Sequence, residues 1–190
     1  MFIQTEATPN PATLKFIPGR TVLPSGTLEF REPSEAAASP LATRLFGIEG
    51  VTGVFLGQDF VSVSKLEPLA WQHLKPAVLG AIMEHFMSGA PVVSGADAGT
   101  GAATDSGPED FAAEDREIVD AIKELIETRV RPAVANDGGD IVFRGYREGV
   151  VILHMRGACA GCPSSTATLR NGIENMLKHY VPEVTEVRAA

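Results

Sequence analysis

The sequence predicts an α+β protein with two small α+β domains joined by a flexible linker. The length of 190 residues allows one large domain or two small ones. Residues 94–110 read SGADAGTGAATDSGPED and contain no large apolar side chain that could offset the entropy lost on ordering. On both sides of this segment, alternating apolar residues typical of strands occur beside the spacing of three and four typical of helices. We therefore expect an amino-terminal domain at 1–90, a linker at 91–112 and a second domain at 113–190.

The amino-terminal domain is expected to begin with two short strands, Phe2–Thr5 and Thr13–Ile17. They are joined through Pro9-Asn10-Pro11, where proline fixes φ and lacks an amide hydrogen, as suits a turn. A short helix is expected over 40–46, followed by a hairpin over 50–65 (GVTGVFLGQDFVSVSK) that turns at 57–59. A longer helix is expected over 69–87. Its predicted apolar face comprises Leu69, His73, Pro76, Leu79, Ile82, Met83 and Phe86.

The second domain is expected to open with a helix from about Ala113. Acidic residues lie in its first turn and Arg129 and Arg131 near its end, as the helix dipole favours. Pro132 predicts a bend or a new short helix, and the glycines of 136–140 (NDGGD) predict a turn. Strands at 141–146 and 150–155, a helix at 163–179 and a last strand at 184–187 complete the expected fold. Pro163, Ser164 and Ser165 suit the start of that helix.

The charge balance argues against two classes of partner. The chain has 16 Lys and Arg against 24 Asp and Glu, a net charge of -8, and so lacks the positive field that draws proteins to nucleic acid or anionic membranes. No apolar run approaches the roughly 20 residues of a membrane helix. The first residues, MFIQTEATPN, resemble neither a signal peptide nor a transit peptide, which predicts a cytoplasmic protein.

The two cysteines of the chain stand together as Cys159-Ala160-Gly161-Cys162, in a loop between a predicted strand and a predicted helix. We expect both sulfurs to be ionised near neutral pH, because a helix amino terminus stabilises thiolates. Thiolates act as metal ligands or as nucleophiles. An iron-sulfur cluster or a structural zinc commonly needs four donors, so other residues or a second chain must complete such a site. A two-fold dimer would let each chain contribute Cys159 and Cys162 to a shared [4Fe-4S] cluster.

Three stretches resemble a known family. Residues 157–166 (GACAGCPSST), 168–174 (TLRNGIE) and 131–140 (RPAVANDGGD) are similar to the NifU carboxy-terminal domain of Nfu-type iron-sulfur scaffold and carrier proteins. Residues 3–16 (IQTEATPNPATLKF) resemble the separate Nfu amino-terminal domain. The resemblance spans both predicted domains and leaves out only the linker.

The resemblance implies a function. The family's cluster ligands fall on Cys159 and Cys162, and its members hold a [4Fe-4S] cluster on a homodimer and pass it to apo iron-sulfur enzymes. It also implies that upstream cluster assembly proteins act as donors and that the protein is a carrier and not an enzyme. The first domain is assigned recipient recognition, since it shows no cluster of catalytic groups. Because several members are mitochondrial, the expected location is a bacterial cytoplasm, or the mitochondrial matrix for a processed form.

Other interpretations of the cysteine pair remain. A C-x-x-C motif before a helix also occurs in thiol-disulfide oxidoreductases, although these need a βαβ unit ahead of the motif, where this sequence predicts a hairpin. The run 157–161 (GACAG) imitates the nucleophile elbow of hydrolases, but no Asp follows Cys159 and only one His does.

Three further groups of residues have alternative interpretations. Asp137 and Asp140 could bind a metal, but turn chemistry explains them better. His154 is the histidine that could reach a metal at the cysteines, since it precedes Cys159 by five positions. Arginines concentrate around the cysteine motif and form either a solvated surface, a docking patch for acidic recipients or a local field for an anionic cluster: Arg144, Arg147, Arg156 and Arg170.

Overall fold

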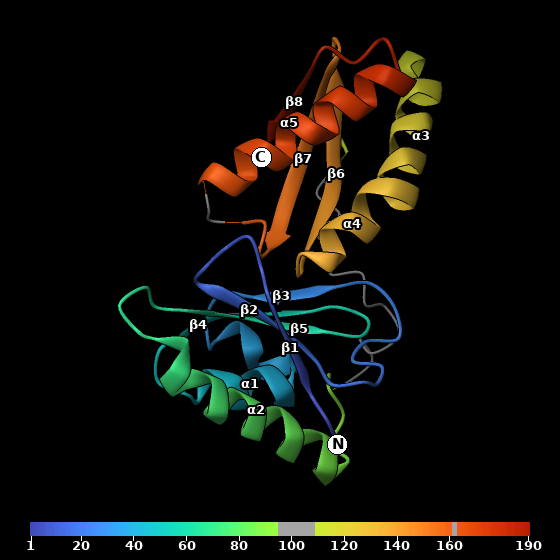
Figure 1. Ribbon diagram of the computed structural model, residues 1–190. Coiled ribbons are helices and arrows are strands. Elements are labelled where there is room, and N and C mark those ends of the chain that lie inside the picture. The colour runs from blue at the N-terminus through green and yellow to red at the C-terminus, as the bar shows by residue number, and fades with distance from the viewer. Residues whose placement is uncertain (95–108, 161–162) are drawn as a thin grey trace. The chain divides into compact units, whose positions relative to one another are not determined.

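The computed structural model describes residues 1–94, 109–160 and 163–190. The chain divides into two compact units, Met1–Ala103 and Thr104–Ala190. Each unit has its own sheet and its own helices, which confirms the α+β class with two small domains (Figure 1).

The first unit is built on a five-stranded antiparallel sheet with the order β1-β2-β5-β4-β3. The strands are β1 (Gln4–Ala7), β2 (Thr13–Ile17), β3 (Leu28–Phe30), β4 (Val51–Leu56) and β5 (Val61–Lys65). The two predicted amino-terminal strands and the predicted β4–β5 hairpin are confirmed, with β1 displaced by two residues. Strand β3 was not predicted; it is a three-residue edge strand that is held by its pairing with β4.

Helices cover one face of this sheet (Figure 1). They are the short 3-10 helix η1 (Glu35–Ala38), α1 (Pro40–Phe46) and α2 (Trp71–Ser88). Helix α1 begins where predicted because Pro40 stands at its first position and the Ser39 hydroxyl accepts a hydrogen bond from the Ala42 amide at 3.1 Å. Helix α2 ends at Gly89, whose φ of 70° is the left-handed conformation that glycine adopts readily.

The predicted apolar face of α2 is confirmed only in part, since Leu79 and Phe86 are partly buried against the core. The buried residues are Leu74, Val78, Ile82 and His85, so only Ile82 of the expected set is fully buried. Met83 is 36% exposed and Met87 is 76% exposed. The helix has apolar residues around most of its circumference, so the spacing of apolar residues could not distinguish the buried side from the exposed side.

A long helical run opens the second unit. It consists of η3 (Ala113–Asp115), α3 (Arg116–Leu125), the π-helical turn η4 (Ile126–Val130) and α4 (Arg131–Asn136). Pro132 lies at the start of α4, as expected for a proline that begins a new helix. The buried side of the run comprises Val119, Ile122, Ile126, Val130 and Val134.

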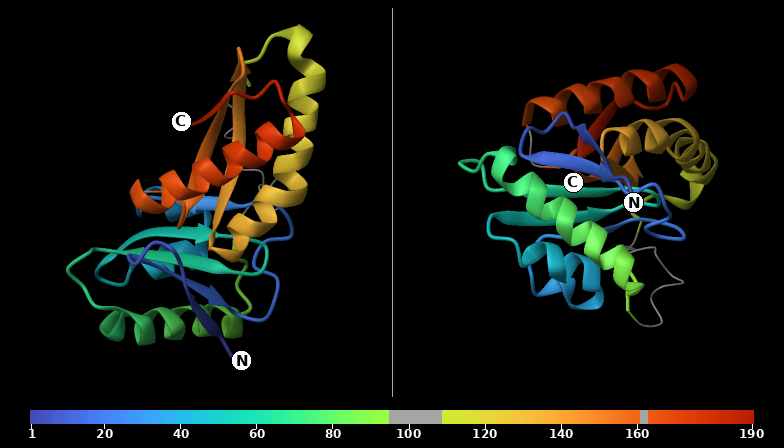
Figure 2. Two further views of the ribbon diagram at one scale, coloured as in Figure 1. Left: turned by 45° about the horizontal axis from the view of Figure 1, so that its top comes forward. Right: turned by 60° about the horizontal axis from the view of Figure 1, so that its bottom comes forward.

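The sheet of the second unit has three strands in the order β6-β7-β8. Strands β6 (Gly139–Arg147) and β7 (Val150–Gly157) form an antiparallel hairpin, and β8 (Glu186–Ala189) pairs with β7 in parallel after helix α5 (Pro163–Tyr180). The hairpin and both later elements were predicted, although β8 lies two residues further along than expected. Figure 2 shows the helices of this unit beside its sheet. Side chains of α3, η4, α4 and α5 form the core with one face of the sheet.

Several residues of the predicted linker pack against one unit or the other. Val93 is buried in the first core, while Phe111 packs against the second core. The Asp110 backbone pairs with β6, donating to the Arg144 carbonyl and accepting from the Tyr146 amide. The middle of the predicted linker, 95–108, lies outside the described residues. Among the helices that are described, none combines the length and the apolar character needed to cross a membrane.

Candidate functional site

The fold brings two distant motifs together at one end of the β6–β7 hairpin. Gly139 pairs with Gly157, and Asp140 pairs with Arg156 on the neighbouring strand. The Ala158 amide donates to the Gly138 carbonyl at 3.2 Å. The NDGGD turn at 136–140 therefore lies directly beside the start of the cysteine loop.

Two glycines of this junction are required by geometry. Gly138 has a φ of 79°, which only glycine adopts without strain, and this confirms the expected turn chemistry. A methyl group on Gly139 would lie 2.7 Å from the Cys159 sulfur and 2.7 Å from the Arg156 carbonyl oxygen. The bare backbone at 139 therefore makes room for Cys159.

Cys159 is buried in the core of the second unit, with 5% of its surface exposed. The Thr166 hydroxyl, on the first turns of α5, donates to the Cys159 carbonyl at 3.0 Å and ties the loop to the helix. Burial raises the pKa of the Cys159 thiol to about 12, and the negative charges of Asp137 and Asp140 add to this shift. The expectation of an ionised Cys159 was therefore wrong, because burial and the two nearby carboxylates disfavour the thiolate.

Cys162, the second predicted ligand, lies outside the described residues, as does Gly161. The predicted capping roles of Ser164 and Ser165 concern side chains that are also outside the described part. Cys159 is free of any disulfide to a described residue. In the ranges 1–94, 109–160 and 166–190, no three His, Cys, Asp or Glu side chains are grouped so that they could hold a metal ion.

The Asp140 carboxylate is held by an arginine and does not join such a group. Arg131 donates from Nε to Oδ1 and from Nη2 to Oδ2, both at 2.8 Å, and the Ile141 amide also donates to Oδ1. Hydrogen bonds and charge from Asp140 and Glu127 raise the pKa of Arg131, against the effect of burial. From the sequence, Arg131 was expected only near the end of a helix. No local feature of the sequence marks this pair, because the need for a cation arises from the burial of Asp140 in the folded chain.

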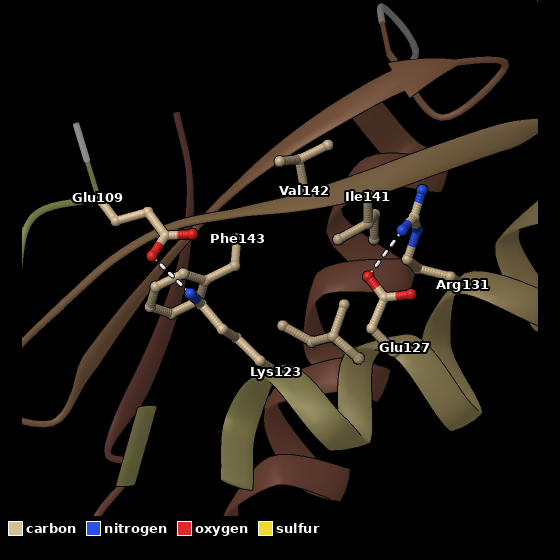
Figure 3. A pocket seen from close by; sticks show the side chains of 8 residues that line it. Glu109, Lys123, Glu127, Arg131, Ile141, Val142 and Phe143 are labelled. Carbon is tan, nitrogen blue, oxygen red and sulfur yellow. Dashed lines mark hydrogen bonds and ion pairs between the residues drawn. The ribbon is translucent and has the colours of Figure 1, made fainter. Parts of the chain in front are cut away.

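A cavity of about 290 Å³ lies beside the edge strand β6 (Figure 3). Apolar side chains line it on the strand and on η4, and two ion pairs bridge it, Lys123–Glu109 and Arg131–Glu127. Its four charged groups are thus already paired with one another. It is lined by Glu109, Lys123, Ile126, Glu127, Arg131, Ile141, Val142 and Phe143.

The remaining candidates form no metal-binding group with Cys159 among the described residues. His154 is half-buried and stands opposite Val142 in the sheet, and it joins no metal-binding group among the described residues. Arg147 is exposed and pairs with Asp110 at 2.7 Å. Arg144 and Arg170 are half-buried and Arg156 is buried.

Comparison with known proteins matches both units. The family model "Scaffold protein Nfu/NifU N terminal" matches residues 3–89, and the "NifU-like domain" matches residues 122–188. A solved structure of a NifU-like protein from Saccharomyces cerevisiae has a TM-score of 0.45 at 26% identity and covers 50% of this chain and 85% of its own.

Named relatives match along nearly the whole chain. The chain is 50% identical over 98% of its length to the human NFU1 iron-sulfur cluster scaffold homolog, mitochondrial, and covers 71% of that protein. It is 52% identical to the protein of the same name from Drosophila sechellia and 48% identical to the Arabidopsis thaliana NifU-like protein 4, mitochondrial. It covers 64% and 65% of those two proteins. With both domains matched in order, the chain belongs to the Nfu family of iron-sulfur cluster scaffold proteins.

Proposed function

We propose that the protein holds a [4Fe-4S] cluster between two copies of itself, through Cys159 and Cys162 of each copy, and transfers the cluster to apo-proteins. The observation that carries this proposal is the cysteine count. The whole chain has two cysteines, both in one motif, whereas a [4Fe-4S] cluster is held by four thiolates. Two copies related by a two-fold axis supply four.

The surroundings of Cys159 support a ligand role. Because Gly139 has no side chain, the Cys159 sulfur lies against the backbone of β6. The Thr166 hydroxyl fixes the position of the Cys159 carbonyl. Because the thiol is neutral when no metal is bound, binding of iron at this sulfur releases a proton. Transfer then proceeds by ligand exchange, in which recipient thiolates form new iron–sulfur bonds as those to Cys159 and Cys162 break.

The decisive experiment is anaerobic reconstitution with ferrous iron and sulfide, followed by native mass spectrometry. We expect a dimer that carries four irons and four sulfides. Cys159→Ser and Cys162→Ser should each lose this species while keeping the circular dichroism of the apo protein. A dimer that pairs a wild-type chain with a doubly substituted chain should also lack the cluster. A monomer that carried the complete cluster would contradict the proposal.

The thiol-disulfide alternative fits the described residues less well. A redox thiol of that class is accessible and has a lowered pKa, whereas Cys159 is buried and its pKa is raised. The hairpin β6–β7 precedes the motif, where the thioredoxin-like pattern needs a βαβ unit. Insulin reduction that required no iron would favour the alternative.

The remaining parts of the proposal concern partners and place. We assign recipient recognition to the first unit, whose helix α2 exposes Met83 and Met87, since methionine side chains adapt to different apolar surfaces. Cluster assembly proteins would act as donors, and the protein would act as a carrier without catalysing a reaction. The relatives named above are mitochondrial, which supports the mitochondrial matrix over a bacterial cytoplasm as the location.

A further inference from the structure

Residues 109–111 attach to an edge of strand β6. Asp110 forms a parallel bridge with Gly145 of that strand. The Asp110 amide donates to the Arg144 carbonyl at 3.1 Å, and the Asp110 carbonyl accepts from the Tyr146 amide at 2.9 Å. Strand β7 occupies the other edge of β6. This segment, which we call the strap, therefore covers part of the edge that the three-stranded sheet leaves open.

Charged and aromatic contacts hold the strap to the rest of the second unit. The Asp110 carboxylate pairs with Arg147 at 2.7 Å, and Glu109 pairs with Lys123 of α3. The Lys123 ammonium also lies 5.8 Å from the centre of the Phe111 ring, within the range of a cation–π interaction. All four charged side chains are at least 36% exposed. Each ion pair is therefore weak and is screened by salt.

The strap also contributes to the wall of the cavity beside β6. Glu109 of the strap and Lys123 of α3 both line this cavity, and their ion pair bridges it (Figure 3). Ile126, Ile141 and Phe143 provide much of the apolar lining. If the strap left β6, Glu109 would leave with it, and this lining would become more accessible to solvent. The strap is thus placed to cover the cavity.

Gly145 provides the space that the strap occupies. A methyl group at this position would lie 2.8 Å from the Asp110 carbonyl oxygen and 3.5 Å from the Asp110 Cβ. The three atoms nearest to it all belong to Asp110, so the added group would collide with the strap and not with strand β7 or the core. The φ of Gly145 is not positive, so alanine fits the backbone there. The substitution Gly145→Ala is therefore a selective way to displace the strap.

We propose that residues 109–111 are a releasable strap, which closes the cavity beside β6 when it is bound and opens the cavity when its ion pairs weaken. Among the described residues, one bridge with two backbone hydrogen bonds and the packing of Phe111 hold the strap, whereas β6 and β7 pair at eight positions. Segments with few contacts open locally at a lower free energy than global unfolding. The strap therefore opens while the hairpin stays folded. This device does not depend on cluster binding and is tested without a cluster.

The first test is amide hydrogen exchange of the full apo chain, measured by NMR. The Tyr146 amide donates to the strap, so its exchange rate reports opening. Gly145→Ala should speed exchange at Tyr146 about tenfold and leave the other amides of the β6–β7 ladder unchanged. Gly172→Ala, where the added methyl group meets nothing within 4 Å, should leave Tyr146 unchanged. An unchanged rate at Tyr146 in Gly145→Ala, or equal acceleration along the whole ladder, would overturn the proposal.

Salt and charge substitutions test the ion pairs of the strap. Raising the ionic strength shortens the screening length from about 10 Å at ~0.1 M to about 3 Å at ~1 M, so exchange at Tyr146 should quicken about two- to fivefold. The double variant Glu109→Gln/Asp110→Asn lacks both ion pairs and should exchange rapidly at either ionic strength. Glu114→Gln, at an exposed position of η3, should keep the wild-type response. A double variant that kept the full salt dependence would contradict the role of these pairs.

Opening of the cavity is measured by acetylation of Lys123 with an N-hydroxysuccinimide ester, followed by mass spectrometry. The amine reacts when it is free of its carboxylate partner, so Gly145→Ala should speed the labelling of Lys123 about three- to tenfold. Lys75, on α2 of the first unit, is the internal reference and should react at the same rate in both proteins. If Lys123 reacted no faster while exchange at Tyr146 accelerated, the strap would not close the cavity and the proposal would be wrong.

Discussion

Arg131 donates two parallel hydrogen bonds of 2.8 Å to the Asp140 carboxylate, one from Nε and one from Nη2. The side chain of Asp140 is only 4% exposed, and that of Arg131 is 29% exposed. This pair joins the start of α4 to the start of strand β6, immediately beside the cysteine loop. A carboxylate buried to this extent depends on its partner cation.

Arg131→Met should destabilise the second unit by about 2–4 kcal/mol, because it leaves the Asp140 carboxylate buried without its cation. Arg147→Met is the matched control. Arg147 pairs with Asp110 at the surface, so loss of this pair should lower the free energy of unfolding by about 1 kcal/mol or less. Urea unfolding followed through the amide NMR signals of β6 and β7 measures both. Equal losses in the two variants would refute the structural role assigned to Arg131.

Gly139→Ala should destabilise the apo second unit by about 1–3 kcal/mol, because the added methyl group would collide with the Cys159 sulfur and the Arg156 carbonyl. Gly172→Ala is the control. A methyl group at Gly172, within α5, meets nothing within 4 Å, and alanine there should stabilise by roughly 0.5–1 kcal/mol. Both are measured by urea unfolding. If Gly139→Ala left the free energy of unfolding unchanged, the Cys159 side chain would have room to move.

His85 should make the first unit sensitive to acid. Its side chain is fully buried and, among the described residues, it alone has buried side-chain nitrogens without a hydrogen-bond partner. Burial, followed by the positive charge of Arg44, lowers the pKa of His85. The Arg44 side chain pairs with Glu84.

Because the folded-state pKa is lowered, the unfolded chain takes up a proton first, so stability falls as the pH drops below about 6.5. The loss is at most about 1.4 kcal/mol per pH unit. Trp71, the single tryptophan, reports unfolding of this unit by fluorescence. His85→Leu should remove the dependence, and His73→Gln, at an exposed position of the same helix, should keep it. An unchanged pH profile in His85→Leu would assign the sensitivity elsewhere.

Thr166→Val should speed loss of the reconstituted cluster to a chelator about three- to tenfold. It removes the hydrogen bond that holds the Cys159 carbonyl, worth about 1 kcal/mol. Thr166→Ser keeps the hydroxyl and should restore the wild-type rate. Absorbance of the cluster after addition of the chelator gives the rates. If the serine variant failed to restore the rate, the hydrogen bond would not be the cause.

Met87→Glu should slow cluster delivery to a recipient apo-protein several-fold and leave iron content unchanged, if the first unit recognises recipients. Met87 is 76% exposed on α2, so a charge there costs little stability but opposes apolar docking. Gln72→Glu, exposed on the same helix, is the control for added charge. Delivery is measured by the circular dichroism of the recipient after it has gained the cluster, or by the recovered activity of the recipient. Equal delivery rates in the wild-type protein, Met87→Glu and Gln72→Glu would contradict the assignment of recipient recognition to this face of α2.

Local signals in the sequence identified most of the elements. Pro40 after Ser39 marks the start of α1, and the alternation of 50–65 marks a hairpin, because each signal depends only on neighbouring residues. Strand β3 was missed because three residues carry too little alternation, and its existence depends on pairing with β4. The buried side of α2 was misassigned because burial is decided by the sheet it packs against.

The identity of the cluster ligands stays a prediction from the sequence, and the electrostatics around Cys159 could not be predicted from it. The two cysteines follow from the motif, whereas the thiol pKa of Cys159 depends on burial and on Asp137, which the turn brings close. The partnership of Arg131 with Asp140 arises from the packing of α4 on β6 and has no local signature. Spacing along the chain predicts which residues carry chemistry, whereas the protonation of a residue such as Cys159 depends on the fold.

The contact between Gly139 and Cys159 also sets a direction of approach. Because a methyl group at Gly139 would already overlap the sulfur, the main chain of β6 blocks that side of Sγ. An electrophile or a metal must therefore reach the sulfur from the side away from the strand. The hairpin thus acts as a one-sided shield for the thiol, since chemistry at sulfur needs an open trajectory to its lone pairs.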